Sequence, residues 1–181
     1  GDGEASAIRS SWPRFRGANF DAVSSENLPL ADAWPASGPA VLWKVELGEG
    51  HAGAAVADGR VYVLDYDQRQ RADVLRCLSL DDGREIWSRG YFVQILRNHG
   101  MSRTTPAVAQ GVVLTLGPLG HVLAVDAQSG QLLWALDLVK QYGTKIPEWY
   151  AGQCPLIDEG KAVLAPAGGD LMIALDLRSG K

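Results

Sequence analysis

Three segments of the chain share one short pattern, and this repeat limits the fold more than any other feature. They cover residues 77–87, 124–134 and 174–181, and their glycines, Gly83, Gly130 and Gly180, lie 47 and then 50 residues apart. In each copy, apolar residues lead into a polar turn that ends in glycine, and in the first two copies more apolar residues follow. The pattern is typical of a strand, a tight turn and a second strand. A chain that repeats such a unit folds as a repeat architecture.

The best-formed copy explains the turn chemistry. The carboxylate of Asp126 can accept hydrogen bonds from the backbone N–H groups that follow, and Ser129 can do the same more weakly. Gly130 provides a positive φ at little steric cost. Asp176 and Gly180 repeat the pattern in the third copy. We therefore predict that these residues shape the turn and take no part in chemistry.

Tryptophans recur with the same period. Trp43, Trp87 and Trp134 lie 44 and then 47 residues apart. We expect each large apolar ring to fill the gap between neighbouring repeat units.

A second shared unit lies upstream of each copy. Asp58-Gly59, Gln110-Gly111 and Glu159-Gly160 each separate two short apolar runs, which is a hairpin signal. Each period therefore holds four short strands, expected in the second period near 105–109, 112–117, 121–126 and 131–136. Four strands in a period of about 40–50 residues indicate the blades of a β-propeller. The fold class is all-β, a propeller of four-stranded blades.

The repeat also predicts the division of the chain. Residues 1–39 have no period and are expected to form an extended arm, and residues 40–181 a partial propeller. Within it we expect a lone strand at 40–47, blades at 51–90 and 103–137, and an incomplete blade at 152–181. Closed propellers need about four to eight blades. The chain is therefore interpreted as an incomplete, N-terminal fragment of a longer propeller.

Composition excludes several classes. The net charge is −4 and no basic patch is visible, which argues against a nucleic-acid partner. No apolar run has the length of a transmembrane segment, and no signal peptide is visible. Cys77 is expected to be a small buried residue, and no disulfide with Cys154 is expected. The charged stretch 65–73 is interpreted as a solvated hairpin tip, and 138–150 as a connection with one short helical turn.

Functional residues are expected just before the innermost strand of each blade. In a propeller these strands line the central channel, so the residues before them form one mouth. The predicted ligand or partner face comprises His51, Arg97, Asn98, His99, Arg103, Tyr150 and Gln153. The alternative is that these residues are ordinary hydrated side chains without a ligand. No catalytic set is recognised, and no metal site is predicted because His51, His99 and Cys154 have no close ligand spacing.

The repeat resembles that of the pyrroloquinoline-quinone (PQQ)-like, or quinoprotein-type, β-propellers. The motif Ala-x-Asp-x-x-Ser-Gly-x-x-x-Trp fits fully at 124–134, while Cys77, Ser79 and Asp82 depart from it in the first copy. The opening Trp12-Pro-x-Phe-Arg-Gly17 resembles the start of bacterial, envelope-associated members. The resemblance implies a location in the periplasm or cell envelope.

Two functions follow as expectations. The first is a non-catalytic binding or scaffold module with a protein partner or small ligand at the channel mouth and no cofactor. The alternative, implied by the same resemblance, is part of a PQQ- and calcium-dependent dehydrogenase. Such enzymes carry a vicinal Cys–Cys pair and an acidic calcium set, and only Glu49 is acidic near the expected channel strands. Trp149 and Tyr150 also suggest a carbohydrate-binding propeller.

Overall fold

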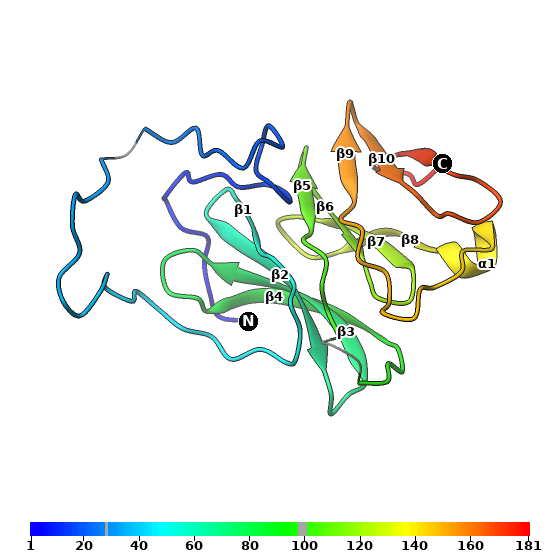
Figure 1. The fold of residues 1–181 in the computed structure, drawn as a ribbon, viewed down its shortest axis with the longest axis horizontal. Coiled ribbons are helices and arrows are strands. Elements are labelled where there is room, and N and C mark those ends of the chain that lie inside the picture. Colours follow the sequence, from blue (N-terminus) through cyan, green and yellow to red (C-terminus); the bar gives the residue numbers. More distant parts are fainter. Residues whose placement is uncertain (28, 98–100) are drawn as a thin grey trace.

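The structure, a computed structural model, describes residues 1–181 except 28 and 98–100. Its strands form antiparallel sheets that follow the chain order (Figure 1). The first sheet contains β1 (Ala55–Ala57), β2 (Arg60–Asp67), β3 (Ala72–Ser79) and β4 (Glu85–Phe92). The second contains β5 (Ala107–Ala109), β6 (Val112–Leu116), β7 (His121–Asp126) and β8 (Leu132–Asp137). The third contains β9 (Leu156–Asp158), β10 (Lys161–Leu164) and β11 (Ile173–Asp176).

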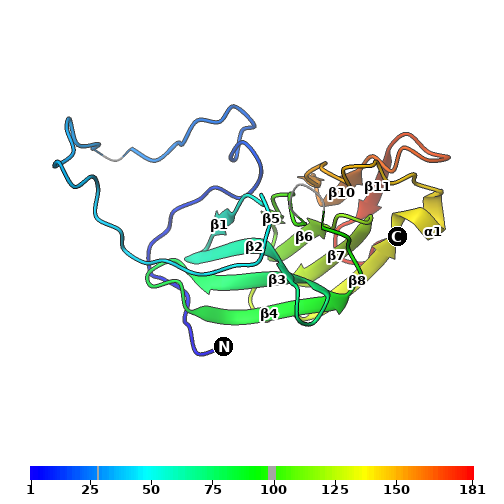
Figure 2. The same ribbon diagram turned by 60° about the horizontal axis from the view of Figure 1, so that its bottom comes forward.

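The sheets lie side by side as propeller blades (Figure 2). The short strands β1, β5 and β9 are neighbours and form the inner edge, while β4 and β8 lie at the outer edge. The expected strands of the second period agree with β5 to β8 within two residues. The all-β propeller fold predicted from the repeat is confirmed.

The turn between the last two strands of a blade has the same geometry in two copies. The backbone and hydroxyl groups of Ser129 both donate to Asp126 Oδ1 at 2.8 Å. Ser179 makes the same two bonds to Asp176, also at 2.8 Å. Gly130 follows at φ 68°, a conformation that disfavours residues with a Cβ. These side chains are therefore fully engaged in local structure.

Each repeat tryptophan reaches the next blade in the same way. The indole N–H of Trp87 donates to the carbonyl of Ala127 at 3.2 Å, and that of Trp134 to Leu177 at 2.8 Å. The Trp87 ring also lies against Gly130, where an added Cβ would come within 2.6 Å of the ring. Glycine is thus needed in this turn both for its conformation and for the close approach of the ring.

The lone strand expected at 40–47 is not formed. Its residues have no ladder partner in the described structure, and Val41 and Leu42 are 81% and 84% exposed. A strand requires a hydrogen-bonded neighbour. The first sheet consists of β1 to β4 alone, and residues 40–47 do not pair with any of them. Trp43 nevertheless makes the repeat contact, since its indole N–H donates to the Leu80 carbonyl at 2.9 Å.

The hairpin tip expected at 65–73 is also shorter than predicted. Strand β2 ends at Asp67 and strand β3 begins at Ala72, so only residues 68–71 lie in the turn. Asp65 and Asp73, at the two ends of the expected tip, lie in the paired strands instead, and both are buried. The predicted helical turn is confirmed as α1 (Leu138–Tyr142), which Asp137 caps by accepting from the backbone N–H of Lys140 at 3.1 Å. None of the described helices is long and apolar enough to cross a membrane.

The N-terminal arm crosses the inner edge of the sheets. Trp12 exchanges two backbone hydrogen bonds with Val56 of β1, at 2.8 and 2.9 Å. The carbonyl of Pro13 then accepts from Val108 of β5 at 2.8 Å. Arg14 Nη1 donates to the carbonyl of Ile157 in β9 at 3.0 Å. Three consecutive arm residues thus contact the three inner strands in order.

Candidate functional site

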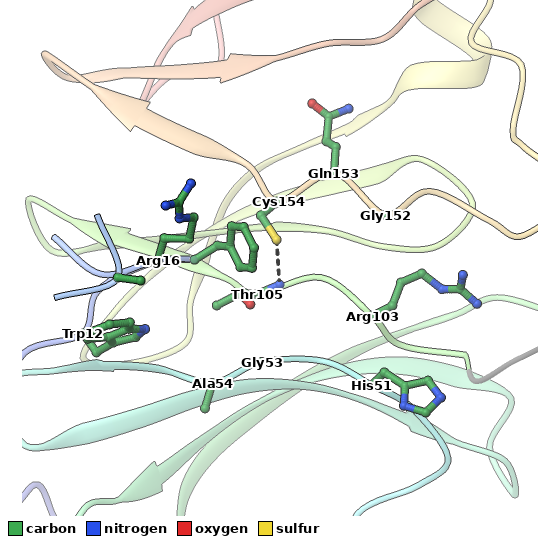
Figure 3. Close-up of a pocket in the computed structure, with 12 residues that line it drawn as sticks. Trp12, Arg16, His51, Gly53, Ala54, Arg103, Thr105, Gly152, Gln153 and Cys154 are labelled. Carbon is green, nitrogen blue, oxygen red and sulfur yellow. Dashed lines mark hydrogen bonds between the residues drawn. The ribbon is translucent and has the colours of Figure 1, made fainter. Parts of the chain in front are cut away.

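A cavity of about 830 Å³ lies between the arm and the segments that lead into the inner strands. The arm and the segments that precede β1, β5 and β9 all contribute to it. Its lining comprises Trp12, Phe15, Arg16, Ala22, His51, Gly53, Ala54, Arg103, Thr105, Gly152, Gln153 and Cys154. Gly53, Thr105 and Cys154 each lie two residues before an inner strand, and the structure brings these three residues together (Figure 3).

Backbone contacts hold the neighbouring segments at close distance. The N–H of His51 donates to the Ser102 carbonyl at 2.6 Å, and the N–H of Thr105 donates to Cys154 Sγ at 3.3 Å (Figure 3). Gly53 permits this packing, because an added Cβ would lie 2.4 Å from Thr105 Oγ1. The floor of the cavity is therefore fixed by contacts between blades.

The arm forms the opposite wall. A loop over residues 14–22 closes through hydrogen bonds of 3.0 Å from Gly17 N–H to Arg14 O and from Ala22 N–H to Arg16 O. The guanidinium of Arg14 lies 4.9 Å from the centre of the Phe20 ring. Gly17 adopts φ 77° beneath the Trp12 ring. The repeat gave no indication that Trp12, Phe15 and Arg16 of the arm contribute to the cavity.

Only some residues of the predicted ligand or partner face have side chains that point into the cavity. His51 and Arg103 line the cavity, and their side chains lie next to each other at one end (Figure 3). Tyr150 is adjacent, with the Arg103 guanidinium 5.8 Å from its ring centre. The Tyr150 hydroxyl donates to the Leu96 carbonyl at 2.5 Å. Asn98 and His99 lie outside the described residues.

Two further predicted residues have other partners. Gln153 borders the cavity, but its amide nitrogen donates to the Ala165 carbonyl and its amide oxygen accepts from the Ala165 N–H, both at 2.8 Å. Figure 3 shows its side chain turned away from Thr105 and His51. Arg97 is not among the lining residues and forms an ion pair with Glu49 at 2.8 Å.

The charge of the cavity differs from that of the chain. The protein carries more acidic than basic residues, yet the described lining contains Arg16, Arg103 and His51 and no aspartate or glutamate.

Cys77 and Cys154 are both free thiols, and Cys77 is buried as predicted. Within the described ranges, no group of three or more His, Cys, Asp or Glu side chains could hold a metal ion.

A second polar cluster, which the sequence did not indicate, lies between the first two blades. Asp73 is 1% exposed and accepts from the hydroxyls of Tyr91 at 2.8 Å and Ser102 at 3.3 Å. Burial raises the pKa of Asp73 to about 6, and the two hydroxyl bonds offset only part of this rise. The Tyr91 ring packs 5.1 Å from that of His121 in β7, whose pKa burial lowers. The cluster is a structural contact between blades.

A family comparison matches residues 70–181 to the family described as "Outer membrane protein assembly factor BamB", whose repeats are PQQ-like. The chain belongs to the PQQ-like repeat family. It is 31% identical to the outer membrane protein assembly factor BamB of Yersinia pestis over 144 residues, 78% of this chain. It is 30% identical to the Escherichia coli protein of the same name over 111 residues, 53% of this chain. The matches span only 35% and 26% of those relatives.

Solved structures of this family share the fold. The quinohaemoprotein alcohol dehydrogenase of Comamonas testosteroni matches 97% of this chain with a TM-score of 0.65 and 22% identity. A quinohaemoprotein alcohol dehydrogenase of Pseudomonas putida matches 78% with a TM-score of 0.54 and 26% identity. These matches cover 27% and 21% of the two enzymes. Proteins with different names therefore share this fold, which does not by itself indicate a function.

Proposed function

We propose that this chain is part of a non-catalytic PQQ-like propeller that serves as a binding or scaffold module in the bacterial cell envelope. The proposal treats residues 1–39 as the arm and 40–181 as part of the propeller, with blades at 51–90, 103–137 and 152–181. The observation that carries it is a cavity built jointly by the arm and three blades, lined by cationic and aromatic side chains. The names of the curated relatives support the envelope location and a protein partner.

The dehydrogenase alternative is supported by the 26% identity to the Pseudomonas putida enzyme. The described residues fit such a cofactor site poorly. Calcium is bound by several oxygen ligands, usually including carboxylates, and the described lining contains no carboxylate. Cys77 and Cys154 are far apart in the sequence, so they cannot form a vicinal disulfide. A quinone and calcium site at this cavity would need ligands from beyond its described lining.

Quinone titration of the full-length protein tests the two functions. Absorbance is followed with and without calcium, together with alcohol-dependent reduction of a dye. The scaffold function predicts no saturable spectral change and no dye reduction. Saturable quinone binding with substrate-dependent dye reduction would establish the dehydrogenase instead.

Site-specific photocrosslinking tests the binding face directly. A photoreactive amino acid at Phe15, in the cavity, is expected to crosslink to a discrete protein in cells that produce the full-length protein. The same group at Leu171, which is 81% exposed and does not line the cavity, is the matched control. Equal crosslinking patterns from the two positions would argue against a binding face at the cavity.

A further inference from the structure

The outer strand of the first blade presents a free edge over most of its length. Among the described residues, β4 is the last strand of its sheet and pairs only with β3. The N–H of Val93 donates to the Arg71 carbonyl at 2.9 Å, which fixes the alternation of the ladder. The backbone groups of Ser88, Gly90 and Phe92 therefore point away from β3. They form a row of donors and acceptors along the edge.

The other free edges of the described sheets are covered or shorter. The arm covers β1 and β5 through the backbone bonds of Trp12 and Pro13. A register shift in β8 leaves a regular ladder only over 134–137, whereas that of β4 is regular over 87–92. The strands of the third sheet have only three or four residues. β4 therefore offers the longest regular edge in the described part of the chain.

The arm already touches the beginning of this edge. The N–H of Gly3 donates to the Glu85 carbonyl at 3.0 Å, and the N-terminus lies beside β4 (Figure 2). An extended backbone can thus approach the edge. The remaining part, 87–92, is open to a further segment.

The edge also carries little protection against pairing. Natural edge strands are commonly protected by charged side chains. Between Trp87 and Phe92 the sequence has one charged residue, Arg89, and its Nε donates to the Gly130 carbonyl of the second blade at 2.5 Å. That side chain is therefore directed between the blades, away from a strand that would approach the edge. Gly90, at the centre, has no side chain to obstruct it.

A groove of about 400 Å³ lies beside this edge, between the first two blades. β4 contributes Arg89, Gly90 and Tyr91 to one side, and the second blade contributes apolar residues that include Leu123 and Leu132 to the other. In a strand paired with β4, every second side chain lies on the same face as Arg89 and Tyr91. Such a side chain would point toward the groove.

We propose that an extended segment of a partner protein adds to β4 as a fifth strand and places an apolar side chain in the groove. The proposal rests on the proposed binding function and deepens it by naming the form of the partner. A second copy of the chain fits less well, because its own β4 would bring Arg89 and Tyr91 to the groove. Both side chains are already bonded within their own molecule, to Gly130 and Asp73. A different protein can supply leucine or phenylalanine instead.

Fluorescence anisotropy with the full-length protein tests the pairing. The probe is a short fluorescein-labelled peptide that alternates threonine and leucine and ends in two lysines for solubility. One control peptide is methylated at every backbone nitrogen, and another carries serine in place of every leucine. We expect saturable binding of the probe and binding about tenfold weaker or more for each control, which lacks either the backbone donors or the apolar side chains. No saturable binding, or equal binding of the three peptides, would overturn the proposal.

Variants locate the site. Ser88→Pro removes an N–H that points away from β3, so it should weaken probe binding by about tenfold while the ladder within the sheet remains. Ser88→Ala keeps this N–H and should bind as the wild type does. Ala135→Glu places a charge in the groove and should also weaken binding by about tenfold. Val139→Glu adds the same charge at an exposed position that does not line the groove, and is the matched control.

Circular dichroism of each variant monitors its folding, and Ala135→Glu keeps the test valid if Ser88→Pro does not fold. Unchanged binding in Ala135→Glu, or in both variants, would refute the site. Dimerisation that light scattering detects and Ser88→Pro abolishes would show that a second copy occupies the edge, which would refute the partner segment.

Two outcomes separate this inference from the proposed function. Crosslinking at Phe15 to a protein, without binding of the probe peptide, would refute the strand addition and leave the scaffold function standing. Quinone-dependent dye reduction would refute the scaffold function whatever the peptide result.

Discussion

Replacing Asp73 with asparagine should make the stability of the protein much less dependent on pH. The carboxylate is buried between the first two blades and accepts from the hydroxyls of Tyr91 and Ser102. Asparagine has nearly the same shape, its amide oxygen can accept one bond, and its amide group can donate to the other hydroxyl. The substitution therefore removes the buried charge and retains the packing.

The sign follows from the direction of the pKa change. Burial raises the pKa of Asp73 from 3.8 to about 6, so the folded protein binds a proton more readily than the unfolded chain. Stability therefore falls as pH rises from about 4 to about 6, and the loss is complete above that range. A difference of about two pKa units corresponds to roughly 3 kcal/mol of unfolding free energy. Asp73→Asn should be as stable as the wild type or more stable near neutral pH.

The assay is urea unfolding of the full-length protein at several values between about pH 4 and pH 7.5. The difference between wild type and variant should change by up to about 3 kcal/mol across this range. Asp32→Asn, an exposed change in the arm, is the control for the loss of one carboxylate. The same pH dependence in wild type and Asp73→Asn would show that the carboxyl is not abnormally protonated. The reasoning on burial would then be wrong.

Three further substitutions test how the blades are joined. Trp87→Ala should lower the unfolding free energy by about 3–5 kcal/mol, measured with urea, because a buried ring and its bond to the Ala127 carbonyl are lost. Gly117→Ala should lower the melting temperature more than Gly169→Ala, because the added Cβ would lie 2.2 Å from the Tyr91 hydroxyl at Gly117 and no closer than 3.9 Å to any neighbour at Gly169. Asp126→Ala should cost about 1 kcal/mol in urea unfolding, because the turn loses its acceptor for three groups.

The blade architecture could be predicted because its signals are local. The bonds from Ser129 to Asp126 join residues three positions apart, and Gly130 adopts its positive φ in the same turn. A short-range signal of this kind repeats in the sequence whenever the blade repeats. The spacing of the tryptophans was equally informative, because each ring serves one interface between adjacent blades.

The arm and the buried acids could not be predicted in the same way. Arg14 reaches the Ile157 carbonyl, 143 positions away, and no pattern in either segment indicates this contact. The burial of Asp73 depends on Ser102 and on the absence of a side chain at Gly117, which lie in other segments. The strand expected at 40–47 failed for a related reason. Its alternation suited a strand, but a strand also needs a neighbour to pair with.

The structure divides the residues that line the cavity into those committed to packing and those exposed to solvent. The Gln153 amide forms two hydrogen bonds with the backbone of Ala165, and the Thr105 N–H donates to Cys154 Sγ. Substitutions at Gln153 or Cys154 should therefore disturb both the contacts between blades and the shape of the cavity. The side chains of Phe15 and Arg16 are exposed on an arm loop that is closed by backbone hydrogen bonds. Their loss should alter binding at the cavity with little effect on the propeller. The function of the cavity is therefore best sought in the arm, which lies outside the repeat.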